Sequence, residues 1–147
     1  MKNFIYLLPF IAGISMSIQS GINGQLRTAV GQPLAAAFFS FLGGTITLLL
    51  LLLVSKTYIP GWQQLNGIAW YKYLGGPLGV IVVTFVILSV HRVGASQMFV
   101  LLIAGQLITA LIMDRYGLLG LSPTNVSIQK MAGIVLVIAG AYLVTKK

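Results

Sequence analysis

Long uncharged apolar runs, separated by short polar segments, make up most of this chain. Five runs are predicted to be helices, at residues 4–26, 33–54, 73–90, 93–113 and 128–146. A hydrocarbon core of about 30 Å needs roughly 20 helical residues, so the first four are long enough to span a membrane. The fifth is shorter, and we expect the lysines at its two ends to extend its reach by snorkelling. The pattern therefore predicts an all-α integral membrane bundle of five transmembrane helices, forming one domain over residues 1–147.

The connections between these runs differ in length and composition. Residues 27–32 and 91–92 are predicted to be tight connections, with Pro33 starting the second helix because its missing N–H is harmless there. The segment 55–72 is long and rich in tryptophan and tyrosine, which favours a short helix along the membrane interface. Ser127 is the predicted N-cap of the last helix.

Composition supports a membrane protein and removes several other classes. The chain is 58% hydrophobic and 7% charged, whereas ordinary soluble domains are about 25% charged. The net charge of +8 comes from single basic residues at the ends of apolar runs, which is typical of membrane flanks and not of a nucleic-acid surface. The first run is about 23 residues long and lacks a clear cleavage site, so we expect it to be retained as a helix.

Small residues recur at four-residue spacing on the first two predicted helices. Gly13, Ser17 and Gly21 share one face of the first helix, and Ser40 and Gly44 share one face of the second. Inside a membrane, small side chains allow helix backbones to approach closely. We interpret these five positions as helix-packing residues.

Amide and hydroxyl side chains occupy unusual places within two of the apolar runs. Ser15, Gln19 and Asn23 line one face of the first helix, and Gln106 and Thr109 share a side of the fourth. An unsatisfied amide in hydrocarbon costs several kcal/mol, so these groups must face protein or a wet cavity. Two explanations stay open, namely hydrogen bonds between helices and a substrate-binding pathway near the bilayer midplane.

Catalytic and metal-binding chemistry has almost no residues to use. The chain holds one histidine, one acidic residue and no cysteine, which argues against an enzyme, a metal site or a bound cofactor. The single acid, Asp114, is either paired with its neighbour Arg115 at a helix end or a candidate for coupling transport to an ion. A multivalent cation would find little counter-charge, so a neutral, zwitterionic or anionic solute fits better.

Two stretches carry a family resemblance that covers essentially the whole chain. They are "INGQLRTAVGQPLAAAFFSFLGGTITLL" (Ile22–Leu49), with Asn23, Leu26, Arg27, Gly31, Pro33, Ser40, Phe41 and Gly44, and "AGQLITALIMDRYGLLGL" (Ala104–Leu121), with Ala104, Gly105, Gln106, Asp114, Gly117, Leu118, Gly120 and Leu121. The chain resembles the YdcZ-like family of small exporters in the drug/metabolite transporter superfamily. The resemblance implies a half-size transporter unit in a bacterial inner membrane. A non-transporting scaffold or accessory subunit is the alternative.

The flanking charges bear on orientation and assembly. With five spans, one side carries Lys2, Lys56, Lys72, Arg115 and Lys130, and the other carries Arg27, Arg92, Lys146 and Lys147. Since orientation follows an excess of Lys and Arg toward the cytoplasm, this near balance predicts weakly directed insertion. We therefore predict an antiparallel homodimer with dual topology that transports by alternating access. A single orientation, with the N-terminal side inward, remains the alternative.

Overall fold

The computed structural model describes residues 7–146, which divide into two compact units with a boundary between Arg92 and Val93. The first unit contains α1 (Leu7–Val30), α2 (Pro33–Ser55), α3 (Trp62–Asn66), the 3₁₀ helix η2 (Trp70–Leu74) and α4 (Gly75–Val93), except that the last residue of α4 lies beyond the boundary. The second contains α5 (Ala95–Tyr116), the 3₁₀ turn η3 (Leu118–Gly120) and α6 (Ile128–Thr145). No strand occurs among residues 7–146, so the all-α prediction is confirmed for this part of the chain.

Four segments within the described residues are long and apolar enough to cross a membrane. They are Pro33–Ser55, Trp70–Val93, Ala95–Tyr116 and Ile128–Thr145. With 24 residues, α1 has sufficient length, but its amides and Arg27 lower its mean hydropathy below that of the other four. A fifth span formed by α1 therefore stays a prediction, and the predicted helix start at residues 4–6 lies outside the described residues.

Glycines with positive φ end the helices at places different from those predicted. The first helix was expected to end at residue 26, but α1 continues to Val30, where Gly31 (φ 77°) donates its N–H to the Arg27 carbonyl at 2.8 Å. Likewise His91 and Arg92, predicted to be a connection, lie in the last turn of α4, and the chain turns at Gly94 (φ 83°). The sequence prediction ended both helices too early, at basic residues. Basic residues are compatible with the last turn of a helix, whereas the positive φ angles that turn the chain at Gly31 and Gly94 favour glycine.

Local start signals were read correctly. Pro33 is the first residue of α2, and the Ser127 hydroxyl accepts a hydrogen bond from the Lys130 backbone N–H at 3.2 Å, capping α6. A short helix, α3, forms within residues 55–72, and the Tyr73 hydroxyl donates to the Leu65 carbonyl at 2.9 Å beside it. The interfacial position of this segment stays a prediction.

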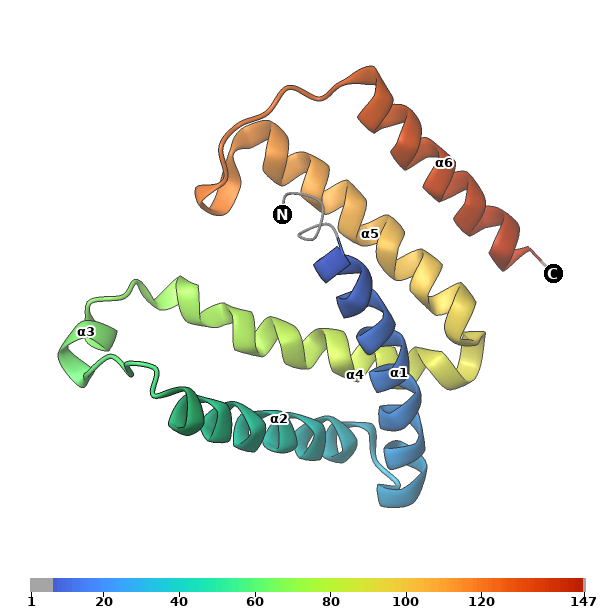
Figure 1. The fold of residues 1–147 in the computed structure, drawn as a ribbon. Coiled ribbons are helices and arrows are strands. Elements are labelled where there is room, and N and C mark those ends of the chain that lie inside the picture. The colour runs from blue at the N-terminus through green and yellow to red at the C-terminus, as the bar shows by residue number, and fades with distance from the viewer. Residues whose placement is uncertain (1–6, 147) are drawn as a thin grey trace. The chain divides into compact units, whose positions relative to one another are not determined.

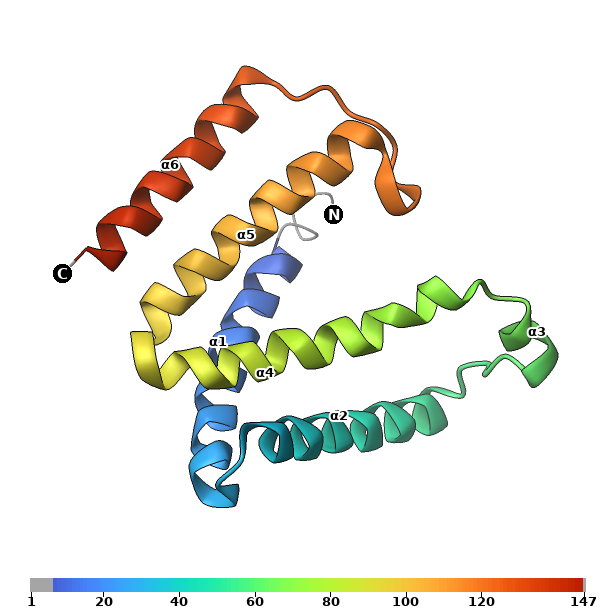
Figure 2. The same ribbon diagram turned by 180° about the vertical axis from the view of Figure 1, so that it is seen from behind.

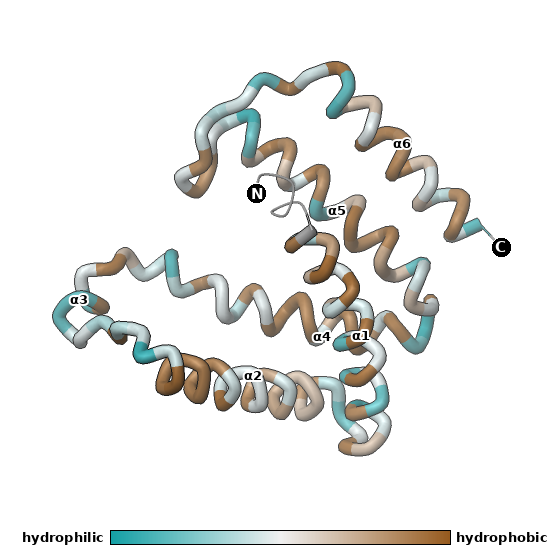
Figure 3. Tube along the Cα trace, in the orientation of Figure 1, coloured by the Kyte–Doolittle hydropathy of each residue, from teal (hydrophilic) through white to brown (hydrophobic). Residues whose placement is uncertain are grey.

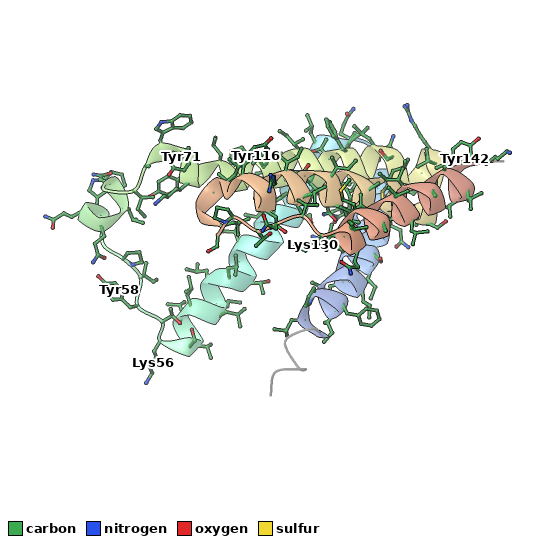
Figure 4. The ribbon with its side chains drawn as sticks, turned by 90° about the horizontal axis from the view of Figure 1, so that it is seen from above. Lys56, Tyr58, Tyr71, Tyr116, Lys130 and Tyr142 are labelled. Carbon is green, nitrogen blue, oxygen red and sulfur yellow. The ribbon has the colours of Figure 1, made fainter. Side chains whose placement is uncertain are left out.

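The first unit packs around the C-terminal end of α1. Ala36 and Ala37 from the start of α2 are buried against Ile87 of α4, and Leu26 and Val30 of α1 pack on this cluster. From there α2 and α4 extend away from α1 and are rejoined through the segment containing α3 (Figure 1). Viewed from above, their distant ends diverge (Figure 4). The small side chains of Ala36 and Ala37 are what let the three helices meet here.

The second unit is an antiparallel pair of helices, α5 and α6, joined by residues 117–127 (Figure 2). Gly117 (φ 62°) caps α5 through its N–H to the Met113 carbonyl, and the Thr124 N–H donates to the Asp114 carbonyl at 2.8 Å. These contacts fold the connecting segment back along the end of α5. The start of α6 is thereby placed beside the last turns of α5.

Apolar residues cover most of the helices, and polar residues gather in α1 and at the helix ends (Figure 3). Many large apolar side chains are exposed, with Val54 at 81% and Leu136 at 72%. Such surfaces are unfavourable in water but are solvated by lipid tails, so a membrane helix needs little interior burial. The exposed apolar surface therefore fits helices embedded in a bilayer.

Candidate functional site

The polar face predicted on α1 divides into two environments. Ser15 uses its hydroxyl locally, donating to the Ile11 carbonyl at 3.0 Å, and it is exposed. Gln19, one turn further along, is exposed and lines a groove, whereas Asn23, another turn along, is only 4% exposed. The face therefore runs from an open groove into the interior of the first unit.

The groove lies between α1 and α2 and has a volume of about 240 Å³. Gln19 contributes the amide, and Ser40, Phe41, Gly44, Thr45 and Leu48 of α2 complete the lining. The Thr45 hydroxyl donates to the Phe41 carbonyl at 2.8 Å. Ser40 and Gly44, interpreted from the sequence as packing residues, thus border open space in the described part of the chain.

The other predicted packing glycines also have free space around them. A Cβ added at Gly13, Gly21 or Gly44 would meet nothing within 4 Å among the described residues. Gly24 differs, because a Cβ there would lie 2.7 Å from Nε2 of His91 and 3.4 Å from Cγ1 of Val90. Among the glycines of α1, Gly24 is therefore the one that lies closest to α4, and packing through the remaining glycines stays a prediction.

Arg27 extends the polar face of α1 into this contact. It follows Asn23 by one turn and is half-buried, and its Nη1 donates to the Ile87 carbonyl of α4 at 3.3 Å. The sequence analysis placed Arg27 in the connection between the first two helices. The four-residue spacing of Ser15, Gln19 and Asn23 nevertheless continues to Arg27. In residues 7–146 the Asn23 amide makes no hydrogen bond, which leaves its polar atoms available.

A second polar group without a partner lies on α4. Oγ1 of Thr84 is buried and has no hydrogen-bond partner in the described residues. Buried hydroxyls are normally paired, so an unpaired one is a natural contact for water or a bound solute.

The predicted residues of α5 belong to the second unit. Gln106 is exposed, and the Thr109 hydroxyl donates to the Gly105 carbonyl at 2.9 Å. Each residue lies on the helix as predicted. A cavity that they share with Gln19 and Asn23 stays a prediction.

The expected pairing of Asp114 with Arg115 is wrong. Oδ2 of Asp114 lies 3.5 Å from Nζ of Lys130, whereas Arg115 donates to Oδ1 of Asn125 at 3.4 Å. Neighbouring residues on a helix point about 100° apart, so the next basic residue in sequence is poorly placed for an ion pair. The start of α6 brings Lys130 to the Asp114 carboxylate instead.

The ion pair closes one end of a groove of about 400 Å³ between α5 and α6. Its remaining lining is apolar, from Leu107, Ala110, Leu111, Gly133, Ile134 and Val137. The side chains of Lys130 and Asp114 are 50% and 40% exposed, so water weakens their attraction. Among the described residues, no group of three or more His, Cys, Asp or Glu side chains comes together.

Comparison with known proteins agrees with the motifs in α1, α2 and α5. The family described as "Putative inner membrane exporter, YdcZ" matches residues 4–143. Inner membrane protein YdcZ of Escherichia coli (strain K12) is 28% identical over 137 residues, covering 92% of this chain and 91% of that protein. No solved structure matches. With nearly its full length matched, this chain belongs to the YdcZ family of inner-membrane exporters.

Proposed function

We propose that this chain is the half-size unit of an inner-membrane exporter that moves a small solute by alternating access. The observation that carries the proposal is the polar face of α1. It presents Gln19 to a groove and then buries Asn23 to 4% exposure, in a unit whose core cluster is the apolar set Ala36, Ala37 and Ile87. A helix packed only for stability gains little from such amides, because interhelical hydrogen bonds in membranes contribute about 0.6–2 kcal/mol each. A solute pathway gives them a role.

The complete pathway requires α1 to span the membrane as the fifth helix. Since α1 is 24 residues long, at about 1.5 Å per residue it extends about 36 Å, which exceeds a hydrocarbon core of about 30 Å. Gln19 and Asn23 then lie toward the second half of the span. Gln106 and Thr109 of α5 contribute to the same pathway in this proposal, and Asp114 is the candidate for ion coupling.

Two copies of the chain are proposed to form the working exporter, one inserted in each orientation. The nine basic residues divide five to four between the two sides, so neither orientation is strongly favoured. Transporters are often built from halves of inverted topology, with the solute site where the halves meet. The groove at Gln19 and the unoccupied space beside Gly13 and Gly21 give a second copy a place to pack.

Transport is tested with the purified chain in liposomes. A panel of neutral, zwitterionic and anionic metabolites is first screened by thermal shift, and each hit is then measured for flux. We expect Asn23→Leu and Gln106→Leu to abolish flux while the protein still inserts and purifies. Gln63→Leu is the matched control, because it removes an exposed amide from α3, outside the site. Full flux in both site variants would show that the two amides have only a structural role. Absence of flux with stable co-purification of one partner would favour a scaffold.

Orientation is tested with two C-terminal fusions, one reporter active only in the cytoplasm and one active only outside it. Comparable activity from both supports dual insertion. A signal from one reporter alone, unchanged when a lysine is added to either side, would exclude it.

A further inference from the structure

The contact between α1 and α4 brings two basic side chains and an amide together. Asn23 and Arg27 are one turn apart on α1, and Ile87 and His91 are one turn apart on α4. The Arg27 guanidinium reaches the Ile87 carbonyl at 3.3 Å. The His91 ring lies against Gly24, with Nε2 only 2.7 Å from where a Cβ would be. The absence of a side chain at Gly24, which lies between Asn23 and Arg27 in the sequence of α1, makes room for the imidazole at this position.

The positive charge of Arg27 has no counter-charge in its unit. The chain has one acidic residue, Asp114, so residues 1–92 contain no carboxylate side chain. The Ile87 carbonyl accepts one of the five N–H groups of the guanidinium and carries no net charge. Because Arg27 is half-buried, water screens its charge less than it would on an open surface.

We propose that Arg27, His91 and Asn23 bind an anionic group, a carboxylate or a phosphate, at the contact of α1 and α4. The planar guanidinium can hold two oxygens of such a group at once. The imidazole of His91 and the amide of Asn23 add N–H donors, and both are neutral or positive, so none repels the anion. With no acid in the unit, no internal carboxylate competes for these donors.

The position of this site also indicates the shape of the solute, a point that rests on the proposed function. Gln19, Asn23 and Arg27 follow one another at four-residue steps, so the backbones of Gln19 and Arg27 are about 12 Å apart along α1. The groove is lined by uncharged side chains. The solute class is therefore a small organic acid or phosphate ester, with its uncharged part toward Gln19 and its anionic group at Arg27.

Binding is tested on the purified full chain in a neutral detergent by thermal unfolding. The probes are inorganic phosphate and succinate, and sodium chloride at equal ionic strength is the reference. We expect both probes to stabilise the wild-type chain beyond the chloride reference. The variants Arg27→Gln and His91→Phe should bind about tenfold or more weakly, because the first removes the guanidinium charge and the second removes an N–H donor to the anion.

The matched control is Arg92→Gln, which removes the same charge from the residue next to His91. Arg92 is exposed and its side chain makes no hydrogen bond among the described residues, so its variant should respond to phosphate like the wild type. The proposal would be overturned if Arg92→Gln weakened the phosphate response as much as Arg27→Gln does. It would also be overturned if sodium chloride stabilised the wild-type chain as much as phosphate at equal ionic strength. If Arg27→Gln does not fold, the exposed His91 still provides the comparison.

A lipid headgroup carries the same chemistry as a phosphate solute. Nanodiscs of neutral phosphatidylcholine are therefore compared with nanodiscs containing phosphatidylglycerol, without added anion. Stabilisation by phosphatidylglycerol that requires Arg27 and His91 and removes the phosphate response identifies the headgroup as the ligand. A phosphate response that persists in both lipids identifies a soluble anion. If Asn23→Leu abolishes flux and the wild-type chain shows no anion response, the proposed exporter function stands and the anion site is rejected. If the wild-type chain shows an anion response but no flux, the anion site stands and the exporter function is rejected.

Discussion

Gly117 is the position where a single added methyl group should have the largest effect on the second unit. Its φ of 62° is in the left-handed region, and a Cβ there would lie 2.7 Å from Cγ and 2.9 Å from Cδ of Pro123. The backbone oxygen of Leu121 is 3.0 Å from the same point. Gly117→Ala therefore adds both backbone strain and a collision with the returning segment.

The two costs can be estimated separately. A left-handed conformation costs a non-glycine residue about 1–2 kcal/mol. Relief of the collision requires Pro123 to move away from α5, which breaks the adjacent hydrogen bond from Thr124 to the Asp114 carbonyl and loses about 1 kcal/mol more. We expect Gly117→Ala to lower the free energy of unfolding by about 2–3 kcal/mol.

Gly120 provides the matched comparison. Its φ is 85°, but a Cβ there would meet nothing within 4 Å, so Gly120→Ala should cost only the strain, about 1–2 kcal/mol. Unfolding is measured by titrating the protein in mixed micelles with sodium dodecyl sulfate, followed by far-UV circular dichroism. The double variant Gly117→Ala, Pro123→Ala should recover the collision cost and approach the stability of Gly120→Ala. Equal stability of the two single alanine variants, or no recovery in the double variant, would refute the reasoning.

Four further predictions concern other contacts. Asp114→Asn, Lys130→Gln and the double variant should give a coupling free energy below about 1 kcal/mol in a double-mutant cycle, because the pair is about half exposed; a larger value would contradict this. Ser127→Ala should lower the free energy of unfolding by about 0.5–2 kcal/mol through loss of the α6 cap, and unchanged stability would show that the cap is dispensable. Gly21→Ala should stabilise the monomeric chain by about 0.5–1 kcal/mol but weaken the proposed homodimer, because its second copy packs at this glycine; unchanged dimerisation would contradict that packing. Gly24→Ala should gain less in the monomer and weaken the phosphate response, because it displaces His91.

Signals that act over a few residues could be read from the sequence. Pro33 and Ser127 marked helix starts because the features that start a helix depend on the next three or four residues. The polar face of α1 was also visible, since residues four apart on a helix share a side. Its continuation to Arg27 was missed because the turn at Gly31 depends on a backbone angle that the neighbouring sequence does not state.

Partners from distant segments could not be read in this way. Lys130 is 16 residues from Asp114, and the Ile87 carbonyl is 60 residues from Arg27. Which residues meet across two helices depends on the rotation and crossing of the helices. Those are set by contacts such as Ala36 and Ala37 on Ile87. The sequence therefore indicated the polar residues of α1 but not the α4 residues that complete the candidate anion site.

The scarcity of acidic residues has a consequence for the energy source of transport. The chain's one carboxylate side chain is 3.5 Å from a lysine in the second unit, and residues 1–92 contain none that could carry a proton with the solute. An anion bound at Arg27 needs no such passenger, because an inside-negative membrane potential drives negative charge outward by about 2.3 kcal/mol per elementary charge for each 100 mV. If the proposed anion is exported without ion coupling at Asp114, export is electrogenic: a potassium diffusion potential imposed with valinomycin should accelerate efflux when it is negative on the solute side and slow it when reversed.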